Sequence, residues 1–157
     1  MNLDNPLLEH LGVRLVEWRP GLCELELDIE PRHLNRQASL QGGVTATLLD
    51  AACGYAGLLT KTDEPPLNAL TLMLAISYLN KVQQGRLKAR GRVTGGGRNV
   101  YFATAELVAD DGRLVATAQG TFKRSNVASS APSLSTDRAD FHRSDKETTC
   151  CVQLSAG

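Results

Sequence analysis

The chain has 157 residues, of which 42% are hydrophobic and 22% charged, so it is long enough for one domain with a sizeable core. Basic and acidic residues number 17 each, and the formal net charge is zero. This balance excludes a global field that would draw the protein to nucleic acid or to an anionic membrane surface. Any anion that it binds must therefore be held by a local site.

A short helix is predicted over residues 5–11, with Pro6 near its first turn and Gly12 as its stop. The N-terminal residues contain no basic segment followed by an apolar run. They do not predict a secretory signal, and we expect a cytoplasmic protein.

Two strands are predicted next, at 13–19 and 22–29, with Pro20-Gly21 between them. In the second strand Leu and Ile alternate with Glu and Asp, which predicts a sheet with one wet face. Residues 30–41 are polar and irregular, and they are expected to form a loop in which His33 is an ordinary loop residue.

Residues 42–60 predict a long apolar helix of about 18 residues with one carboxylate, Asp50, near its middle. A bilayer-spanning helix is disfavoured because this carboxylate is central. Burying an ionised Asp without partners is costly, so another group must satisfy or use it. Asp50 is expected beside Ala46, Cys53 and Gly57, away from the core-facing stripe of Val44, Thr47, Leu48, Ala51, Ala52, Tyr55 and Leu59.

Four further strands are predicted at 68–79, 86–94, 99–109 and 113–123, with Gly-rich or turn-like separators. One apolar helix against one mostly antiparallel sheet gives the α+β class. We expect a single domain over residues 1–124 and a polar, poorly ordered tail over 125–157.

The four cysteines are Cys23, Cys53, Cys150 and Cys151, and they have neither C-x-x-C spacing nor clustered histidines beside them. A zinc site and a disulfide framework are therefore not indicated. Cys53 is expected to pack as a small hydrophobe.

Asn35, the run Gln41-Gly42-Gly43 and the pair Leu49-Asp50 form a pattern that resembles the N…HGG…D motif of the PaaI-like (phenylacetate-degradation type) hotdog thioesterases. The similarity continues through TLMLAISYL at 71–79 and through residues 91–122, and it covers roughly residues 5–123. It implies the hotdog fold, in which a sheet wraps round a central helix. It also implies a dimer or tetramer with active sites at the subunit interface.

The resemblance implies that Asp50 acts as general base or nucleophile on an acyl-CoA thioester, with the Gly42 N–H as oxyanion donor. Asn35 is expected to orient the water or the thioester from the subunit opposite Asp50, and Thr71 to hold water near the carboxylate. Each residue also has a plainer explanation. Asp50 could be hydrogen-bonded in an interface, the glycines could only permit the turn, Asn35 could bond its own backbone, and Thr71 could be an ordinary strand residue.

Gln41 stands where the family has His, and an amide cannot take up a proton near neutral pH. Substrate binding is expected from Gly43, Arg98, Lys123 and Tyr78. The alternating basic residues Arg86, Lys88, Arg90 and Arg92 are either a solvated strand face or partners for CoA phosphates.

The sequence therefore predicts an acyl-CoA thioesterase that works as a homodimer or homotetramer, with no metal and no cofactor, since CoA is part of the substrate. No nucleic acid or membrane partner is expected. The alternative is a hotdog protein that binds acyl-CoA as a sensor or carrier without hydrolysing it, and Gln41 keeps this alternative open.

Overall fold

The computed structural model describes residues 5–59 and 68–125, so the expected tail lies outside the described residues apart from Ser125. The elements follow the predicted order of a short helix, two strands, a long helix and four strands. They are α1 (Pro6–Leu11), β1 (Arg14–Arg19), β2 (Leu22–Asp28), a 3-10 turn η1 (Pro31–His33), α2 (Gly42–Ala56), β3 (Asn68–Tyr78), β4 (Arg86–Gly96), β5 (Val100–Ala109) and β6 (Leu114–Ser125).

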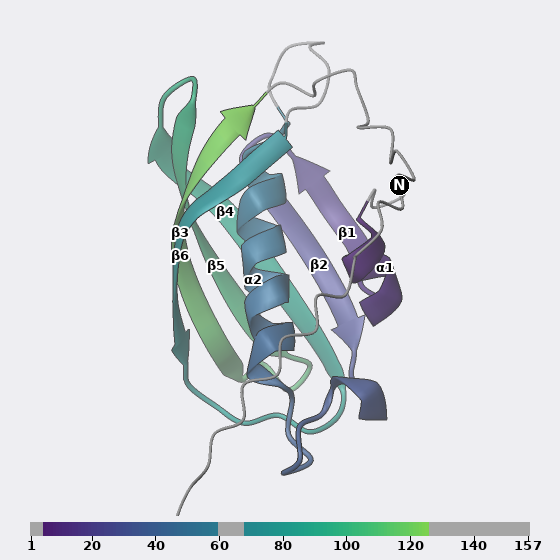
Figure 1. The fold of residues 1–157 in the computed structure, drawn as a ribbon. Helices are drawn as coiled ribbons and strands as arrows, with labels where there is room; N and C mark the ends of the chain where they lie inside the picture. The colour runs from purple at the N-terminus through teal and green to yellow at the C-terminus, as the bar shows by residue number, and fades with distance from the viewer. Residues whose placement is uncertain (1–4, 60–67, 126–157) are drawn as a thin grey trace, which may run out of the picture. The chain divides into compact units, whose positions relative to one another are not determined.

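The six strands form one sheet in the order β1-β2-β4-β5-β6-β3, and every neighbouring pair is antiparallel. Figure 1 shows α2 lying across one face of this sheet, with α1 beside β1. The predicted α+β class and the hotdog arrangement of a sheet round a central helix are confirmed. Among the described residues β1 and β3 are the two edge strands.

The predicted positions of Pro6 in the first turn of α1 and of Gly12 as its stop are confirmed, and the structure adds Asn5 as the N-cap. The Asn5 side-chain oxygen accepts the N–H groups of Leu7 and Leu8 at 3.1 and 3.3 Å, and Pro6 occupies the first turn. Gly12 ends the helix in the left-handed conformation with φ 77°, which glycine adopts without steric cost.

The expected length and stripe of the long helix were wrong. α2 ends at Ala56 with Gly57 as its cap, so it has 15 residues. The sheet curves round the helix and covers more of its circumference than a single stripe. The buried residues of α2 are Thr45, Leu48, Leu49, Ala52, Cys53 and Ala56. Cys53 is therefore in the core, as its small apolar side chain predicted, and not on an open face beside Asp50.

The backbone of α2 packs directly on β4 at Gly91. A Cβ added at Gly91 would overlap the carbonyl of Ala52 and the N–H of Cys53. The neighbouring strand β5 contributes Tyr101, whose buried hydroxyl donates to the Gly54 carbonyl at 2.7 Å. These contacts fix both the height and the end of α2 over the sheet.

We predict that Gly91→Ala destabilises the protein by at least about 2 kcal/mol, because the helix must lift off the sheet to admit a methyl group. Gly95→Ala is the control, since a Cβ at Gly95 on the same strand meets nothing within 4 Å. Urea unfolding measures both variants. Equal stability of the two would contradict this description of the packing.

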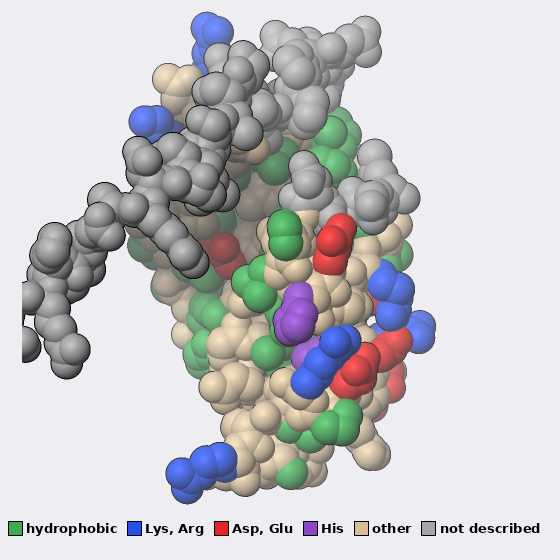
Figure 2. Space-filling model, turned by 45° about the vertical axis from the view of Figure 1, so that its right-hand side comes forward, with side chains coloured by type: hydrophobic (Ala, Val, Ile, Leu, Met, Phe, Trp, Pro, Cys, Tyr) green, Lys and Arg blue, Asp and Glu red, His purple; other side chains and the backbone are tan. Residues whose placement is uncertain are grey.

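Ion pairs cover the outer face of β1, β2 and β4, where acidic side chains of β2 lie between basic side chains of its neighbours. Glu24 accepts from Lys88 at 3.0 Å and from Arg90 at 2.7 Å. Asp28 is paired with Arg14 at 2.9 Å and with Arg86 at 2.8 Å. Figure 2 shows red and blue side chains next to one another on the right of its view. Three of the four alternating basic residues, Arg86, Lys88 and Arg90, therefore form ion pairs with the neighbouring strand β2.

Glu24 is only 4% exposed although the alternation predicted a wet position. Burial raises its pKa, but hydrogen bonds from Lys88 and Arg90 lower it by more, so the pKa lies below its ordinary value. Because the pKa of Glu24 is lower in the folded protein, its ionised carboxylate stabilises the fold, and this contribution is fully present at pH values above the ordinary carboxyl pKa. That stability is lost as the pH falls through the native value.

We predict that Glu24→Gln lowers the free energy of unfolding by about 1–2 kcal/mol at pH 7. The difference from wild type should shrink as the pH falls into the acid range, because wild type then loses the same charge. Glu106→Gln, at an exposed position of β5, should change little. Unfolding curves at a series of pH values test this, and a difference independent of pH would contradict it.

Candidate active site

Asp50 lies half-buried on α2 and is hydrogen-bonded to the edge strand β3. The Thr71 hydroxyl donates to the Asp50 carboxylate at 2.8 Å. Thr71 faces α2 because it pairs with Phe122, which is fully buried on the same face. The fold thus brings a carboxylate and a hydroxyl that are 21 residues apart in the chain into contact at the edge of the sheet.

The first turn of α2 offers unpaired backbone donors. Gln41 is the N-cap, its side chain is exposed, and it makes no side-chain cap bond. Within the part of the chain that the structure describes, the N–H groups of Gly42 and Gly43 meet no acceptor. Free first-turn amides at the positive end of a helix stabilise negative charge. The Tyr78 hydroxyl donates to the Gly42 carbonyl at 3.2 Å, so this predicted binding residue lies against the same turn.

The loop before α2 is fixed by its own backbone and by Asn35. The Asn35 side-chain oxygen accepts the N–H of Gln37 at 2.8 Å and of Ser39 at 3.2 Å. The plainer explanation for this residue is therefore observed in the structure. The nitrogen of the same amide has no bond within residues 5–59 and 68–125, and it is available to a ligand.

His33 anchors this loop, although the sequence indicated only an ordinary loop residue. Its ring is fully buried, accepts the Glu30 N–H at 3.0 Å, and reaches the Leu11 carbonyl at 2.9 Å. Its own carbonyl accepts the Gln41 N–H at 2.9 Å. His33 therefore connects the end of α1 to the residue that starts α2. Nothing in the spacing of the polar loop indicates this role.

Gly42 and Asp50 of one chain are too far apart to hold the same carbonyl group. They are separated by eight residues on one helix, which is about 12 Å at 1.5 Å per residue. The N–H groups of a first turn also point away from the helix body, so an oxygen bound there is no closer to Asp50.

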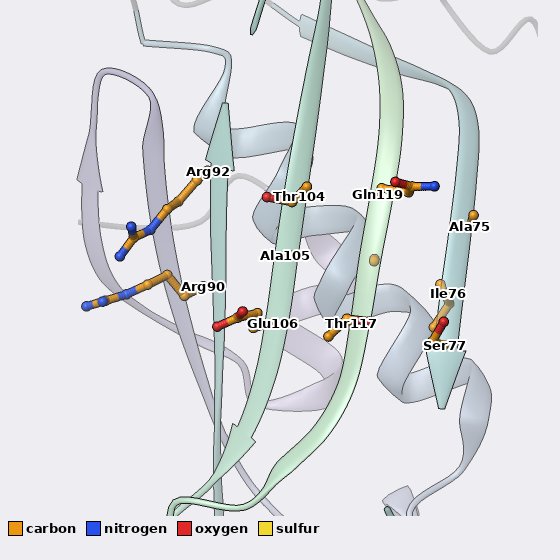
Figure 3. A pocket seen from close by; sticks show the side chains of 11 residues that line it. Ala75, Ile76, Ser77, Arg90, Arg92, Thr104, Ala105, Glu106, Thr117 and Gln119 are labelled. Atoms are coloured by element: carbon orange, nitrogen blue, oxygen red, sulfur yellow. The ribbon is translucent and has the colours of Figure 1, made fainter. Parts of the chain in front are cut away.

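Two of the hollows on the described surface bear on the site. The smaller, of about 350 Å³, contains Asn35 and Tyr78 in its lining, beside the first turns of α2. The larger, of about 640 Å³, lies on the strands β3, β4, β5 and β6. Figure 3 shows Arg90, Arg92 and Gln119 among the side chains that line it. Apart from Arg90 and Arg92 of the alternating basic row, it contains none of the predicted site residues, whereas Asn35 and Tyr78 line the smaller cleft, which is therefore the candidate substrate-binding cleft.

Arg98 and Lys123 are not near the Asp50 carboxylate within one chain. Lys123 follows the inward-facing Phe122 and lies on the outer face of β6. Arg98 is exposed in the turn between β4 and β5. Sequence reasoning missed Arg124, which donates to the Gly57 carbonyl at 2.7 Å and lies 4.4 Å from the Tyr101 ring centroid, so it holds the end of α2.

The buried thiols offer no nucleophile. Burial raises the pKa of Cys23 and of Cys53 to about 12, and the negative charge of Asp50 adds to the shift at Cys53. Both thiols are therefore protonated at neutral pH. In the described ranges no group of three His, Cys, Asp or Glu side chains is placed to hold a metal ion.

Residues 38–116, half of the chain, match the family model described as the thioesterase superfamily. A Pseudomonas aeruginosa protein that bears an esterase name is 32% identical over 127 residues, which cover 75% of this chain and 87% of that protein. Acyl-coenzyme A thioesterase 13 of Mus musculus is 27% identical over 69% of this chain and 77% of its own length.

Solved structures agree with this result. A thioesterase family protein from Silicibacter pomeroyi is 31% identical with a TM-score of 0.67, and the match covers 76% of this chain and 89% of that one. The phenylacetic acid degradation protein PaaI of Thermus thermophilus, in a mutant form, is 26% identical with a TM-score of 0.67, covering 77% and 100%. The chain belongs to the thioesterase superfamily, and its resemblance to the PaaI proteins is confirmed. No described helix combines the length and hydropathy needed to span a membrane.

We predict that His33→Phe destabilises the protein by about 2–4 kcal/mol, because the fully buried ring then no longer bonds the Glu30 N–H and the Leu11 carbonyl. His10→Phe is the matched control, since His10 is exposed on α1. Urea unfolding compares the two variants. A His33 variant as stable as the His10 variant would contradict the anchoring role.

Proposed function

We propose that this protein is an acyl-CoA thioesterase that releases a free acid and CoA, with Asp50 as general base or nucleophile. The observation that carries the proposal is the pairing of Asp50 with Thr71, 2.8 Å apart, at the exposed edge of the sheet. A half-buried carboxylate that accepts a single hydroxyl keeps lone pairs for a water or a substrate.

In the base route the Asp50 carboxylate takes a proton from a water, and the water oxygen bonds to the thioester carbon. The carbonyl oxygen gains the negative charge, and the Gly42 N–H stabilises it. The C–S bond then breaks, the acid is released, and the thiolate of CoA takes up the proton. In the nucleophile route the Asp50 carboxylate attacks the thioester carbon, the C–S bond breaks and CoA leaves as the thiolate. Water then hydrolyses the resulting anhydride, which releases the acid and restores the carboxylate, and the proton from water goes to the thiolate.

The two groups in this scheme must come from two copies of the chain, because about 12 Å of helix separate them within one copy. β3 offers the surface for a second copy. It is an 11-residue edge strand with Leu70, Leu72 and Met73 exposed by 57%, 57% and 46%. Since Thr71 lies among them, a two-fold partner on β3 approaches Asp50.

The proposal is therefore a homodimer with two composite sites, which can pair further into a tetramer. Asp50 and Thr71 of one copy face Gly42 and Asn35 of the other. Gln41 then acts as a neutral hydrogen-bonding group, since an amide donates and accepts without titrating. CoA belongs to the substrate, and the scheme needs no cofactor.

The comparisons support the thioester part of the proposal through the superfamily match. The acyl-CoA part is supported by relatives named acyl-coenzyme A thioesterase 13. Gly43, Tyr78, Arg98 and Lys123 remain predicted substrate contacts. Of these, Gly43 and Tyr78 lie at the first turn of α2, where the scheme places the thioester.

We predict that Asp50→Asn lowers kcat for thioester hydrolysis at least about a hundredfold, because the near-isosteric amide cannot act as base or nucleophile. Thr71→Val should lower kcat by about tenfold through loss of the hydroxyl, whereas Thr71→Ser should retain most of the rate. Thiol release over a panel of acyl-CoA esters measures the rates, with thermal unfolding as the control for folding.

The alternative of a binding protein makes a different prediction. If wild type and Asp50→Asn both bind acyl-CoA esters and neither hydrolyses any ester of the panel, the thioesterase proposal is wrong. Asp50 is then an interface residue of a sensor or carrier.

A further inference from the structure

The cleft of about 350 Å³ beside α2 has the size and lining of a small ligand site. Its floor contains Leu40, Thr45, Val82 and Val115, each less than 10% exposed. Its rim is polar, with Asn35, Gln37 and Ser39 from the loop before α2, and Asn80 and Lys81 from the segment after β3.

Lys81 is the charged residue in this lining. Most described Lys and Arg side chains are already occupied by carboxylates or by backbone carbonyls. Lys81 has no carboxylate within 4.0 Å among residues 5–59 and 68–125. The cleft therefore combines an apolar floor with one cation that has no counter-charge.

The backbone that carries Lys81 is held in place. The Arg113 guanidinium donates to the Lys81 carbonyl at 2.9 Å. The adjacent Asn80 donates through its side chain to the Leu114 carbonyl at 2.8 Å and through its backbone to the Val115 carbonyl at 3.1 Å. The unpaired ammonium group thus extends from an ordered segment.

The cleft lies against the first turn of α2. Tyr78 lines the cleft and also contacts Gly42, and Thr45 lines it from the first turn of α2. A thioester held at the Gly42 N–H can therefore extend one of its ends into the cleft. An anionic group there meets Lys81 and also lies near the positive end of the helix.

We propose that this cleft binds an anionic group of the thioester substrate and that Lys81 is its counter-charge. The proposal rests on the proposed function and names a substrate contact for it. The anion has two sources with the same chemistry, a carboxylate at the far end of the acyl chain or a phosphate of CoA. Both accept hydrogen bonds from an ammonium group.

The test measures binding of non-hydrolysable analogues, in which the thioester sulfur is replaced by CH₂, by titration calorimetry. Three analogues are used: succinyl-CoA, butyryl-CoA of the same chain length without the carboxylate, and butyryl-pantetheine without nucleotide phosphates. The variant Lys81→Met keeps most of the stem and removes the charge, and Lys81→Arg keeps the charge. Arg19→Met, which removes an exposed charge from β1, is the matched control.

We expect Lys81→Met to weaken binding by about tenfold, with Lys81→Arg close to wild type and Arg19→Met unchanged. A loss confined to the succinyl analogue assigns the cleft to the acyl carboxylate. An equal loss for both CoA analogues, with none for the pantetheine compound, assigns it to a CoA phosphate.

Unchanged affinity of Lys81→Met for all three analogues overturns the cleft proposal. Because the assay measures binding and not turnover, this result does not contradict the proposed hydrolysis, which the Asp50→Asn comparison tests separately. If wild type binds none of the analogues, the cleft proposal and the proposed function both fail.

Discussion

The contact between the backbone of α2 and β4 at Gly91 is the constraint on which the rest of the structure depends. Since the strand has no side chain there, the helix lies directly on the sheet at Ala52 and Cys53. This close approach lets the sheet curve round α2, which buries apolar residues over much of its circumference. It also fixes the height of Asp50, which lies two residues before Ala52, relative to Thr71 on β3.

The sequence predicted the elements and their order, because alternation, turn glycines and caps are local signals. It did not predict which residues of α2 are buried, because a curved sheet covers more than one stripe of the helix. Cys53 is an example of that limit. The burial of Glu24 was also missed, since it depends on Lys88 and Arg90 from a strand more than 60 residues away in the chain.

The candidate site also contains residues that the sequence identified and residues that only the structure revealed. Asp50, Gly42 and Thr71 were identified through a resemblance, and the structure adds that Thr71 contacts Asp50 while Gly42 lies two helical turns away. His33 and Lys81 carried no motif. Their roles follow from backbone groups and neighbours that only the folded chain brings together. Among the described residues, the sheet edge, the free amides and the unpaired Lys81 are the features on which the proposed two-copy site rests.

The central claim is that Asp50 and the Gly42 N–H act from different copies, and a mixing experiment tests it most directly. Asp50→Asn lacks the base, and Gly42→Pro lacks the N–H at the first helical position, where proline fits and the extended Gln41 can precede it. Each variant alone is expected to be inactive. Unfolded together and refolded at equal amounts, they should regain about one quarter of wild-type activity, because half of the dimers then carry one intact site. A mixture no more active than its parents would contradict the account.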